Sequence, residues 1–303
     1  MNILKTAISI GNFDAVHKGH QALVQAARDS VGFDGRVEML SFDPLPVTVL
    51  RPDIHVDRIT TFEQREALLL DAGADEVHRI VSTKELLEMQ PDEFLQEIVQ
   101  KYAPVSIVEG AGFRFGKDRM GNIDTLKSCG NDLGFSCIEV DGLEVELHDS
   151  TNVRASSSIV RTLLQEGRVL DVQRILGRAY SLTGEVIQGD HRGRKIGFPT
   201  ANLGKVQTML PKDGIYAGTV EVDSKLFIAA ISIGTKPTFG EHNRVCEVHI
   251  IGFDGEIGNY NWQLRVTISH WIREQLVFDS VEALTIAIQR DIQKAITLIE
   301  SNL

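Results

Sequence analysis

The chain has 303 residues and lacks several features that mark whole classes of protein. Its 3 cysteines show no metal-ligand spacing, which excludes a disulfide-rich fold and a cysteine-ligated zinc site. No hydrophobic run approaches the roughly 18 apolar residues needed to cross a bilayer. The N-terminus also lacks the charged, apolar and small-residue zones of a signal peptide. We therefore expect a protein that stays in the cytoplasm and does not enter a membrane.

An excess of positive charge is missing as well. Lysine and arginine together number 31 against 42 aspartate and glutamate residues, a formal net charge of −11. Residues 1–175 hold 18 basic and 28 acidic residues, net −10, whereas residues 176–303 hold 13 and 14, net −1. Because residues 1–175 are this acidic, they are unsuited to binding the phosphate backbone of a nucleic acid. We expect small-molecule partners held by local donors, and the sequence indicates no particular oligomeric state.

The first half alternates strand-like and helix-like segments. Buried strands are predicted at residues 7–11, 37–42, 77–81, 105–109 and 135–140, and a helix at 18–31. Capping boxes at Thr60 with Glu63 and at Ser82 with Glu85 predict two further helix starts. Helices of this length between strands imply right-handed crossovers and a mostly parallel, Rossmann-like α/β sheet.

The pattern changes near residue 156. Two short amphipathic helices, 157–165 and 169–176, are followed by period-two strands at 181–187, 215–222, 226–233, 245–251 and 263–270, and a last helix at 281–299. Without helices between them these strands predict a small antiparallel β-barrel. We predict two domains, residues 1–175 and 176–303.

A first candidate site lies where the first strand meets the first helix. Residues 11–20 have the sequence GNFDAVHKGH, which puts His17 and His20 on one side of the first helical turn. Backbone N–H groups there favour an anion, and imidazoles can stabilise charge on phosphate oxygens during nucleotidyl transfer. In the plain alternative the two histidines are unrelated, one capping the helix and one at the surface.

Two further segments accompany this string. Residues 156–161 read SSSIVR at a helix start, and residues 110–117 read GAGFRFGK. The latter fits neither a Walker loop nor the dinucleotide fingerprint. Read alone, the first is a helix cap and the second an ordinary glycine loop with aromatic plugs.

Together these strings resemble the His-x-Gly-His nucleotidyltransferase superfamily and its flavin-nucleotide branch. The resemblance implies that His17 and His20 contact the reacting phosphates of ATP. It also implies that Asn12, Ser157 and Arg161 belong to the ATP site, with the last two on the β- and γ-phosphates. Phe113, in the Phe-Arg-Phe-Gly loop, is then a flavin contact.

A second candidate site lies in the antiparallel half. Residues 189–203 read GDHRGRKIGFPTANL, a basic, glycine-rich loop in which Gly193 and Gly197 let the backbone approach phosphate oxygens. Thr200 and Asn202 are neutral oxygen donors suited to Mg²⁺. A generic loop is the alternative, but the motifs at 214–218, 234–240 and 246–249 argue against it.

These strings resemble riboflavin kinase from Gly177 to about Ala295. The resemblance implies that Thr200 and Asn202 bind Mg-ATP and that Glu247 is the catalytic base for the riboflavin hydroxyl. His249 shares the face of Glu247, where it either joins the site or packs beside it. Arg273 matches an arginine near the flavin pocket, or is a surface charge.

The order of the halves resembles the bifunctional FAD synthetase family of prokaryotes. The implied reactions convert riboflavin and ATP to FMN, and then FMN and ATP to FAD and pyrophosphate. Ala15, Leu45 and Gly112 stand where the family usually has glycine, histidine and an aspartate or asparagine, which predicts a weaker adenylyl step. Two alternatives stay open: a monofunctional riboflavin kinase with a degenerate N-terminal binding module, and a His-x-Gly-His transferase acting on another alcohol phosphate.

Overall fold

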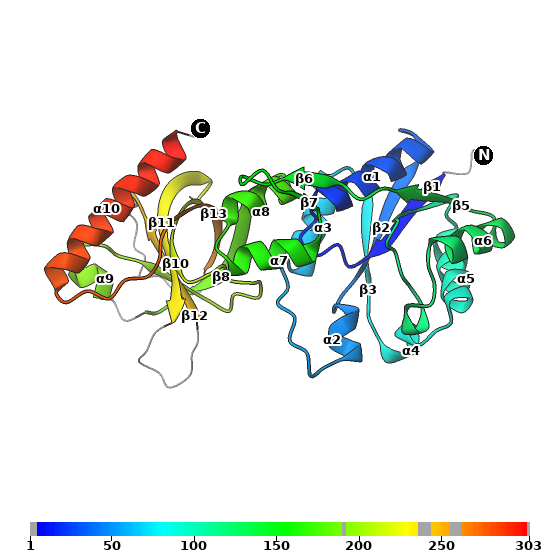
Figure 1. Cartoon of the computed structure of the whole chain (residues 1–303), viewed down its shortest axis with the longest axis horizontal. Coiled ribbons are helices and arrows are strands. Elements are labelled where there is room, and N and C mark those ends of the chain that lie inside the picture. Colours follow the sequence, from blue (N-terminus) through cyan, green and yellow to red (C-terminus); the bar gives the residue numbers. More distant parts are fainter. Residues whose placement is uncertain (1–4, 190–191, 236–243, 255–261, 302–303) are drawn as a thin grey trace. The chain divides into compact units, whose positions relative to one another are not determined.

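A computed structural model describes residues 5–189, 192–235, 244–254 and 262–301 (Figure 1). Internal contacts divide the chain into two compact units, Met1–Val145 with Asn152–Ser157, and Glu146–Thr151 with Ser158–Leu303. The helices of residues 157–176 therefore group almost entirely with the second unit. A domain boundary at residue 175 stays a prediction.

The first unit contains a five-stranded parallel sheet of order β3-β2-β1-β4-β5. Its strands are β1 (Thr6–Gly11), β2 (Arg36–Phe42), β3 (Glu76–Ile80), β4 (Ser106–Gly110) and β5 (Ser136–Val140). Its helices are α1 (Lys18–Val31), α2 (Pro46–Leu50), α3 (Phe62–Asp71), α4 (Lys84–Leu87), α5 (Pro91–Tyr102) and α6 (Ile123–Leu133), with a 3₁₀ turn η1 (Lys117–Arg119). The predicted parallel α/β sheet is confirmed. Strand order reverses between β1 and β4, the switch point where ligands bind in such sheets.

Alternating side chains of the buried strands pack against helices on both faces of this sheet. On one face, α1 and α3 contribute Leu23, Val24, Ala27, Phe62 and Leu69 to the core. On the other, α5 and α6 contribute Phe94, Leu95, Ile98, Ile123 and Leu126. Burial of both faces explains why the strands are almost continuously apolar.

Both predicted helix caps are wrong by one residue. The cap of α3 is Thr61, whose hydroxyl accepts from the Gln64 N–H at 3.3 Å, and the cap of α4 is Thr83. Thr60 instead donates its hydroxyl to Asp14 at 3.0 Å, and Ser82 donates to the Pro44 carbonyl at 2.6 Å. Thr60 and Ser82, which the local sequence predicted as helix caps, thus form hydrogen bonds with the loops after β1 and β2 instead.

The second unit contains a closed antiparallel barrel of order β10-β11-β12-β9-β8-β13, which confirms the predicted barrel (Figure 1). Its strands are β8 (Tyr180–Ile187), β9 (Ala201–Gly204), β10 (Gly214–Val222), β11 (Lys225–Thr235), β12 (Arg244–Ile250) and β13 (Gln263–Arg273). Helices α7 (Ser157–Gln165), α8 (Val169–Leu176), α9 (Arg192–Lys195) and α10 (Val281–Glu300) accompany it. A hairpin that pairs β6 (Glu144–Glu146) with β7 (Asn152–Arg154) falls mostly within the residues of the first unit.

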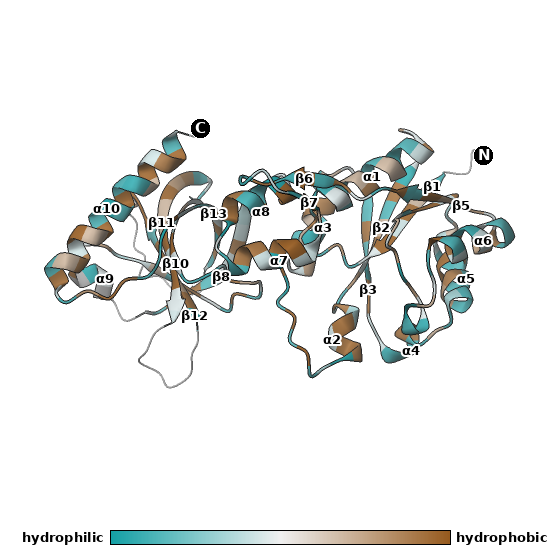
Figure 2. Cartoon of the chain, viewed as in Figure 1, coloured by the Kyte–Doolittle hydropathy of each residue, from teal (hydrophilic) through white to brown (hydrophobic). Residues whose placement is uncertain are grey.

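Hydrophobic side chains fill the barrel and one face of its last helix. Figure 2 shows hydrophobic and hydrophilic residues alternating along α10, which packs Ala295 and Ile299 against Ala217 and Ile272 of the barrel wall. Strand β9 was not predicted, because it is only four residues long and begins inside the Pro-Thr-Ala-Asn segment. Among helices of the described ranges, none combines the length and apolar character that spanning a bilayer requires.

Candidate active sites

The turn after β1 is held in an unusual backbone conformation by a buried carboxylate. Phe13, Ala15 and Val16 have φ angles of 47°, 76° and 43°, in the left-handed region that side chains with a Cβ disfavour. The Asp14 carboxylate accepts hydrogen bonds from the N–H groups of Ile59 and Thr60, at 3.1 and 2.9 Å. Backbone strain in a turn fixed this firmly is typical of functional sites.

This turn delivers the two histidines to one place. His17 immediately precedes α1, His20 lies in its first turn, and their rings stack with centroids 3.6 Å apart. The edge of Phe13 packs against His20 with centroids 5.3 Å apart. A Cβ at Gly19 would lie 3.1 Å from the His17 ring, so the glycine between the histidines permits this close approach.

A cavity of about 350 Å³ opens beside the histidine pair, which we call the histidine pocket. His17, Gly19 and His20 line it, together with Glu109, Gly112 and Phe113, and residues 140–143 and 154–156. A Cβ at Gly112 would meet no atom within 4 Å, so this position has room for a larger side chain.

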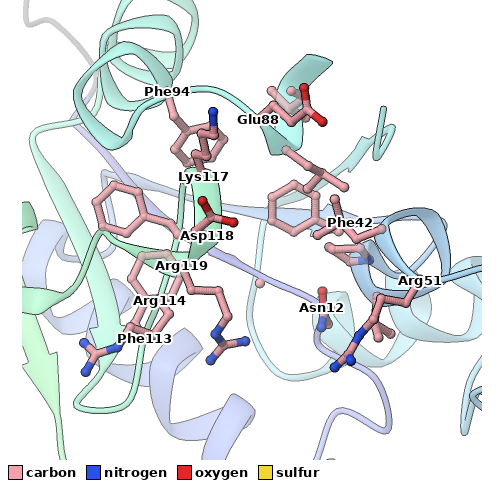
Figure 3. Close-up of a pocket in the computed structure, with 18 of the residues that line it drawn as sticks. Asn12, Phe42, Arg51, Glu88, Phe94, Phe113, Arg114, Lys117, Asp118 and Arg119 are labelled. Atoms are coloured by element: carbon pink, nitrogen blue, oxygen red, sulfur yellow. The ribbon is translucent and has the colours of Figure 1, made fainter. Parts of the chain in front are cut away.

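A larger cavity of about 680 Å³, which we call the aromatic pocket, shares Gly11, Gly112 and Phe113 with the first. Aromatic and cationic side chains line it. These are Phe42, Phe94, Phe113, Phe115, Arg51, Arg114, Lys117 and Arg119. Figure 3 shows Arg51 approaching from one side and Phe113 and Arg114 from the other, with Asn12 between them. The mixture suits a planar apolar ring that carries an anionic group.

Arg65 holds the strand ends that form the aromatic pocket, and sequence reasoning missed it. Its side chain is 1% exposed and donates to the Asn12 carbonyl at 2.6 Å and the Phe42 carbonyl at 2.9 Å. It also pairs with Asp43 at 2.7 Å. Burial lowers the pKa of Arg65, and the charges of Asp14 and Asp43 oppose that shift. The sequence signal was only an arginine on the helical face that also carries buried Phe62 and Leu69.

Two predicted ATP residues lie at the start of α7. The Ser157 hydroxyl donates to the Asp14 carbonyl at 2.7 Å, so it holds the turn that carries the histidines. Arg161 lies one turn further along α7, in the second unit. Leu45, where the family usually has histidine, is buried directly before α2.

In the second unit, strand register aligns the predicted kinase residues. Glu247 of β12 lies directly opposite Asn202 of β9 and directly opposite Ser232 of β11. Directly opposed residues of antiparallel strands present their side chains on the same face. Cys246 points into the barrel core, where burial raises its thiol pKa to about 12. The structure therefore brings Glu247 and Asn202 together on the outer face of the barrel.

The loop before β9 is fastened to β12 through His249. A ring nitrogen, Nδ1, lies 2.9 Å from the Pro199 carbonyl oxygen, and the ring packs edge-on against Phe198. The Phe198 N–H donates to the Gly193 carbonyl at 2.8 Å. A Cβ on Gly193 would lie 2.3 Å from the Phe198 carbonyl oxygen, so only glycine fits there. His249 thus ties the segment that leads to Thr200 to β12.

Arg273 serves the attachment of α10. Its guanidinium donates to both carboxylate oxygens of Asp291, at 3.0 and 2.6 Å, and to the Glu274 carbonyl at 2.8 Å. It also lies 5.8 Å from the centroid of the Phe278 ring.

Gly197 has a φ of 90°, which favours glycine in the turn before Phe198. The motif at 234–240 lies outside the described residues beyond position 235.

Two family models match different parts of the chain. The family described as riboflavin kinase matches residues 176–299, and the family described as FAD synthetase matches residues 2–154. Proteins named bifunctional riboflavin kinase/FMN adenylyltransferase are similar along the chain. The one from Pseudomonas fluorescens is 32% identical, covering 95% of this chain and 91% of its own, and the one from Bacillus subtilis is 31% identical, covering 96% and 92%.

A solved structure shares the fold along nearly the whole chain. The crystal structure of a macrolide-efflux protein from Streptococcus pneumoniae superposes with a TM-score of 0.85 at 27% identity, covering 97% of this chain and 94% of that one.

Proposed function

This chain belongs to the bifunctional riboflavin kinase/FMN adenylyltransferase family, and we propose that each unit houses one of the two active sites. The enzyme phosphorylates riboflavin with ATP to FMN and then adenylylates FMN with ATP to FAD and pyrophosphate. The observation that supports separate sites best is that each unit has its own group of reactive side chains. These are the stacked histidines beside β1 and the Glu247–Asn202 pair on the barrel.

In the kinase unit we assign Glu247 as the base. Its carboxylate accepts the proton of the riboflavin 5′-hydroxyl as that oxygen attacks the γ-phosphate of ATP. Gly193 and Gly197 let the loop backbone approach the phosphates, and His249 holds that loop against β12. Arg273 acts at the flavin end by fixing the segment that leads into α10.

Mg²⁺ fits the donor set of the kinase unit. Thr200 offers a hydroxyl oxygen and Asn202 an amide oxygen, and Asn202 lies opposite the Glu247 carboxylate in the barrel. Neutral and anionic oxygens are the ligands that this ion prefers, and it commonly keeps waters and substrate phosphates as its other ligands. When bound there, the ion would neutralise phosphate charge. We propose Thr200 and Asn202 as its protein ligands.

In the first unit we assign the histidine pocket to ATP and the aromatic pocket to FMN. His17 and His20 donate hydrogen bonds to the reacting phosphates and stabilise the charge that develops at the α-phosphate. Phe113 lines both pockets, and Asn12 lines the aromatic pocket next to Gly11, which both pockets share, where the FMN phosphate must meet ATP. On the family resemblance, Arg161 is proposed to supply a fork of donors for the terminal phosphates of ATP. The cations of the aromatic pocket offset the charge of FMN.

The alternative of a monofunctional kinase rests on Gly112, which removes a polar side chain from the wall shared by both pockets. Incubating the protein with riboflavin, ATP and Mg²⁺ and separating the flavins decides between the two. We expect FMN followed by FAD. FMN alone would support the monofunctional kinase, and no flavin product would overturn the assignment. Cytoplasmic location and the lack of a nucleic acid partner stay predictions.

A further inference from the structure

A glutamate occupies the point where two central strands separate. Strands β1 and β4 pair at Ala7 with Ser106 and at Ile8 with Ile107. Further along, the Ile10 N–H donates to Oε1 of Glu109 at 2.5 Å, and the Ser9 hydroxyl lies 3.4 Å from the same oxygen. The Glu109 side chain therefore takes the place of a backbone acceptor at the switch point of the sheet.

The same carboxyl lines the histidine pocket. Glu109 is 2% exposed, and the pocket that it borders also contains His17 and His20. Nothing in the mechanism assigned above uses this group, although it lies where ATP is expected to bind.

The surroundings of Glu109 favour its neutral form. Burial raises the pKa of Glu109 well above its ordinary value, and the bonds from Ile10 and Ser9 offset only part of that shift. Since Oε1 accepts both of those bonds, the proton of the neutral acid belongs on Oε2. An ionised carboxylate there would also repel the phosphates of a nucleotide.

Titratable and charged groups face Glu109 from three sides. His17 and His20 approach from the start of α1, and Asp141 and Arg154 lie at the rim of the histidine pocket. From β5, Glu139 lies beside Glu109 in register, with Cys137 two residues earlier. The β1 contacts, Ser9 and Ile10, do not titrate. Burial raises the pKa of the Cys137 thiol, so a comparison with Glu109→Gln is needed to assign an alkaline change to Glu109.

We propose that Glu109 is an ATP-binding residue of the adenylyltransferase site that works as a neutral acid and donates a hydrogen bond from Oε2–H to ATP. This inference rests on the assignment of the histidine pocket to ATP. Ionisation of Glu109 removes the donor and places a negative charge under the phosphates. ATP binding at this site therefore weakens as the pH rises through the pKa of Glu109.

Glu109→Gln separates this role from a structural one. The amide keeps an oxygen for the Ile10 N–H and a donor for ATP, but it cannot ionise. Rates of FAD formation from FMN are measured against ATP concentration from neutral to alkaline pH. For the wild type we expect the KM for ATP to rise by about tenfold, with kcat changing less. For Glu109→Gln we expect a KM that stays level, and equal rises in both proteins would overturn the proposal.

An infrared measurement keeps the proposal testable if the variant does not fold or if the wild type makes no FAD. At neutral pH the wild type should show the C=O stretch of a protonated carboxyl that shifts when ATP is added. The band should weaken at alkaline pH. Absence of such a band, or a band that ATP leaves unchanged, would overturn the proposal even in an inactive protein. Failure to make FAD with a responsive band would instead count against the proposed function alone.

Discussion

Glu247 owes its place to strand register. It faces outward because Cys246 and Val248 on either side point into the barrel, and pairing with β9 sets it opposite Asn202. Alternation along β12 predicted that Glu247 faces away from the barrel core. Its position opposite Asn202 could not be predicted, because strand β9 was not predicted. Chemistry at this site therefore depends on a contact between residues 45 positions apart.

Replacing this carboxylate should stop one reaction and leave the other. Glu247→Gln keeps the size of the side chain but removes the base, so FMN formation should fall by about 10²–10⁴-fold. Formation of FAD from supplied FMN should be unchanged, because the stacked histidines belong to the other unit. Both rates can be followed by separating the flavins. Equal loss of both reactions would contradict separate sites.

His20→Ala should have the opposite effect. It removes one of the two stacked rings and a donor to the phosphates, so FAD formation from FMN should fall by about 10²–10³-fold. Formation of FMN from riboflavin should continue at the normal rate. His55→Ala is the matched control, because that imidazole is 87% exposed and its ring nitrogen lies 2.9 Å from the carboxylate of the neighbouring Asp57. A similar loss in both variants would point to a general effect on the fold.

His249 should control ATP binding in the kinase unit through the loop that it holds. His249→Ala loses the contact with the Pro199 carbonyl and should raise the KM for ATP in FMN formation by about fivefold to tenfold, since a hydrogen bond contributes about 1 kcal/mol. His249→Asn, which keeps a donor near the position of Nδ1, should recover most of the loss. A change in kcat alone, without a change in KM, would contradict a positioning role.

The sequence predicted the site residues that belong to a local sequence motif. His17 and His20 are three residues apart on one helical turn, so their proximity follows from helix geometry. Arg65 and Glu109 could not be predicted in this way. Glu109 is a single charged residue in an apolar strand, and Arg65 is one of several charged residues of its helix. The partners of both come from segments far away in the chain.

At the scale of elements, the strands and helices that carry the site were predicted from periodicity. The exceptions have a common cause. Thr60 and Ser82 have the sequence of helix caps but bind the loops after β1 and β2, and β9 is too short to show a period. Tertiary contacts determine the structure at these positions, and such contacts cannot be inferred from a single sequence.

Arg65 should be a main source of stability at the carboxyl ends of β1 and β2. Arg65→Met keeps much of the apolar volume but leaves Asp43 without its closest ion-pair partner and removes the guanidinium donor to the Asn12 and Phe42 carbonyls. We expect the unfolding free energy of the first unit to fall by about 3 kcal/mol, a cost typical of breaking a buried pair. Urea denaturation followed by circular dichroism measures it.

Arg79→Met is the control for Arg65. Arg79 also lies near Asp43, at 3.7 Å, but its side chain is 44% exposed. Its replacement should cost less than about 1 kcal/mol, as exposed ion pairs do. Equal costs for the two variants would contradict the central place given to Arg65.

At the scale of the whole molecule, charge is divided unevenly. Residues 1–175 carry a net charge of −10, yet this part must bind anionic ATP and FMN. Four of its 18 basic residues, Arg51, Arg114, Lys117 and Arg119, line the aromatic pocket together with the acidic Glu88 and Asp118. Local donors must therefore overcome an unfavourable overall field.

This distribution predicts weak electrostatic steering of ATP into the first unit. Salt screens the global field, so kcat/KM for ATP in FAD formation should change by less than about threefold between low and physiological ionic strength. Initial rates at several salt concentrations and fixed free Mg²⁺ measure this. A steep fall with added salt would indicate attraction and contradict the prediction.

The central claim is that one chain carries two independent active sites connected by free FMN. Mixing the variants Glu247→Gln and His20→Ala tests it most directly, with riboflavin, ATP and Mg²⁺ as the only reactants. Alone, the first should leave riboflavin unchanged and the second should stop at FMN. Together they should form FAD, because FMN made by one protein is adenylylated by the other. A mixture that accumulates no FAD, although each variant keeps its own remaining activity, would contradict the account.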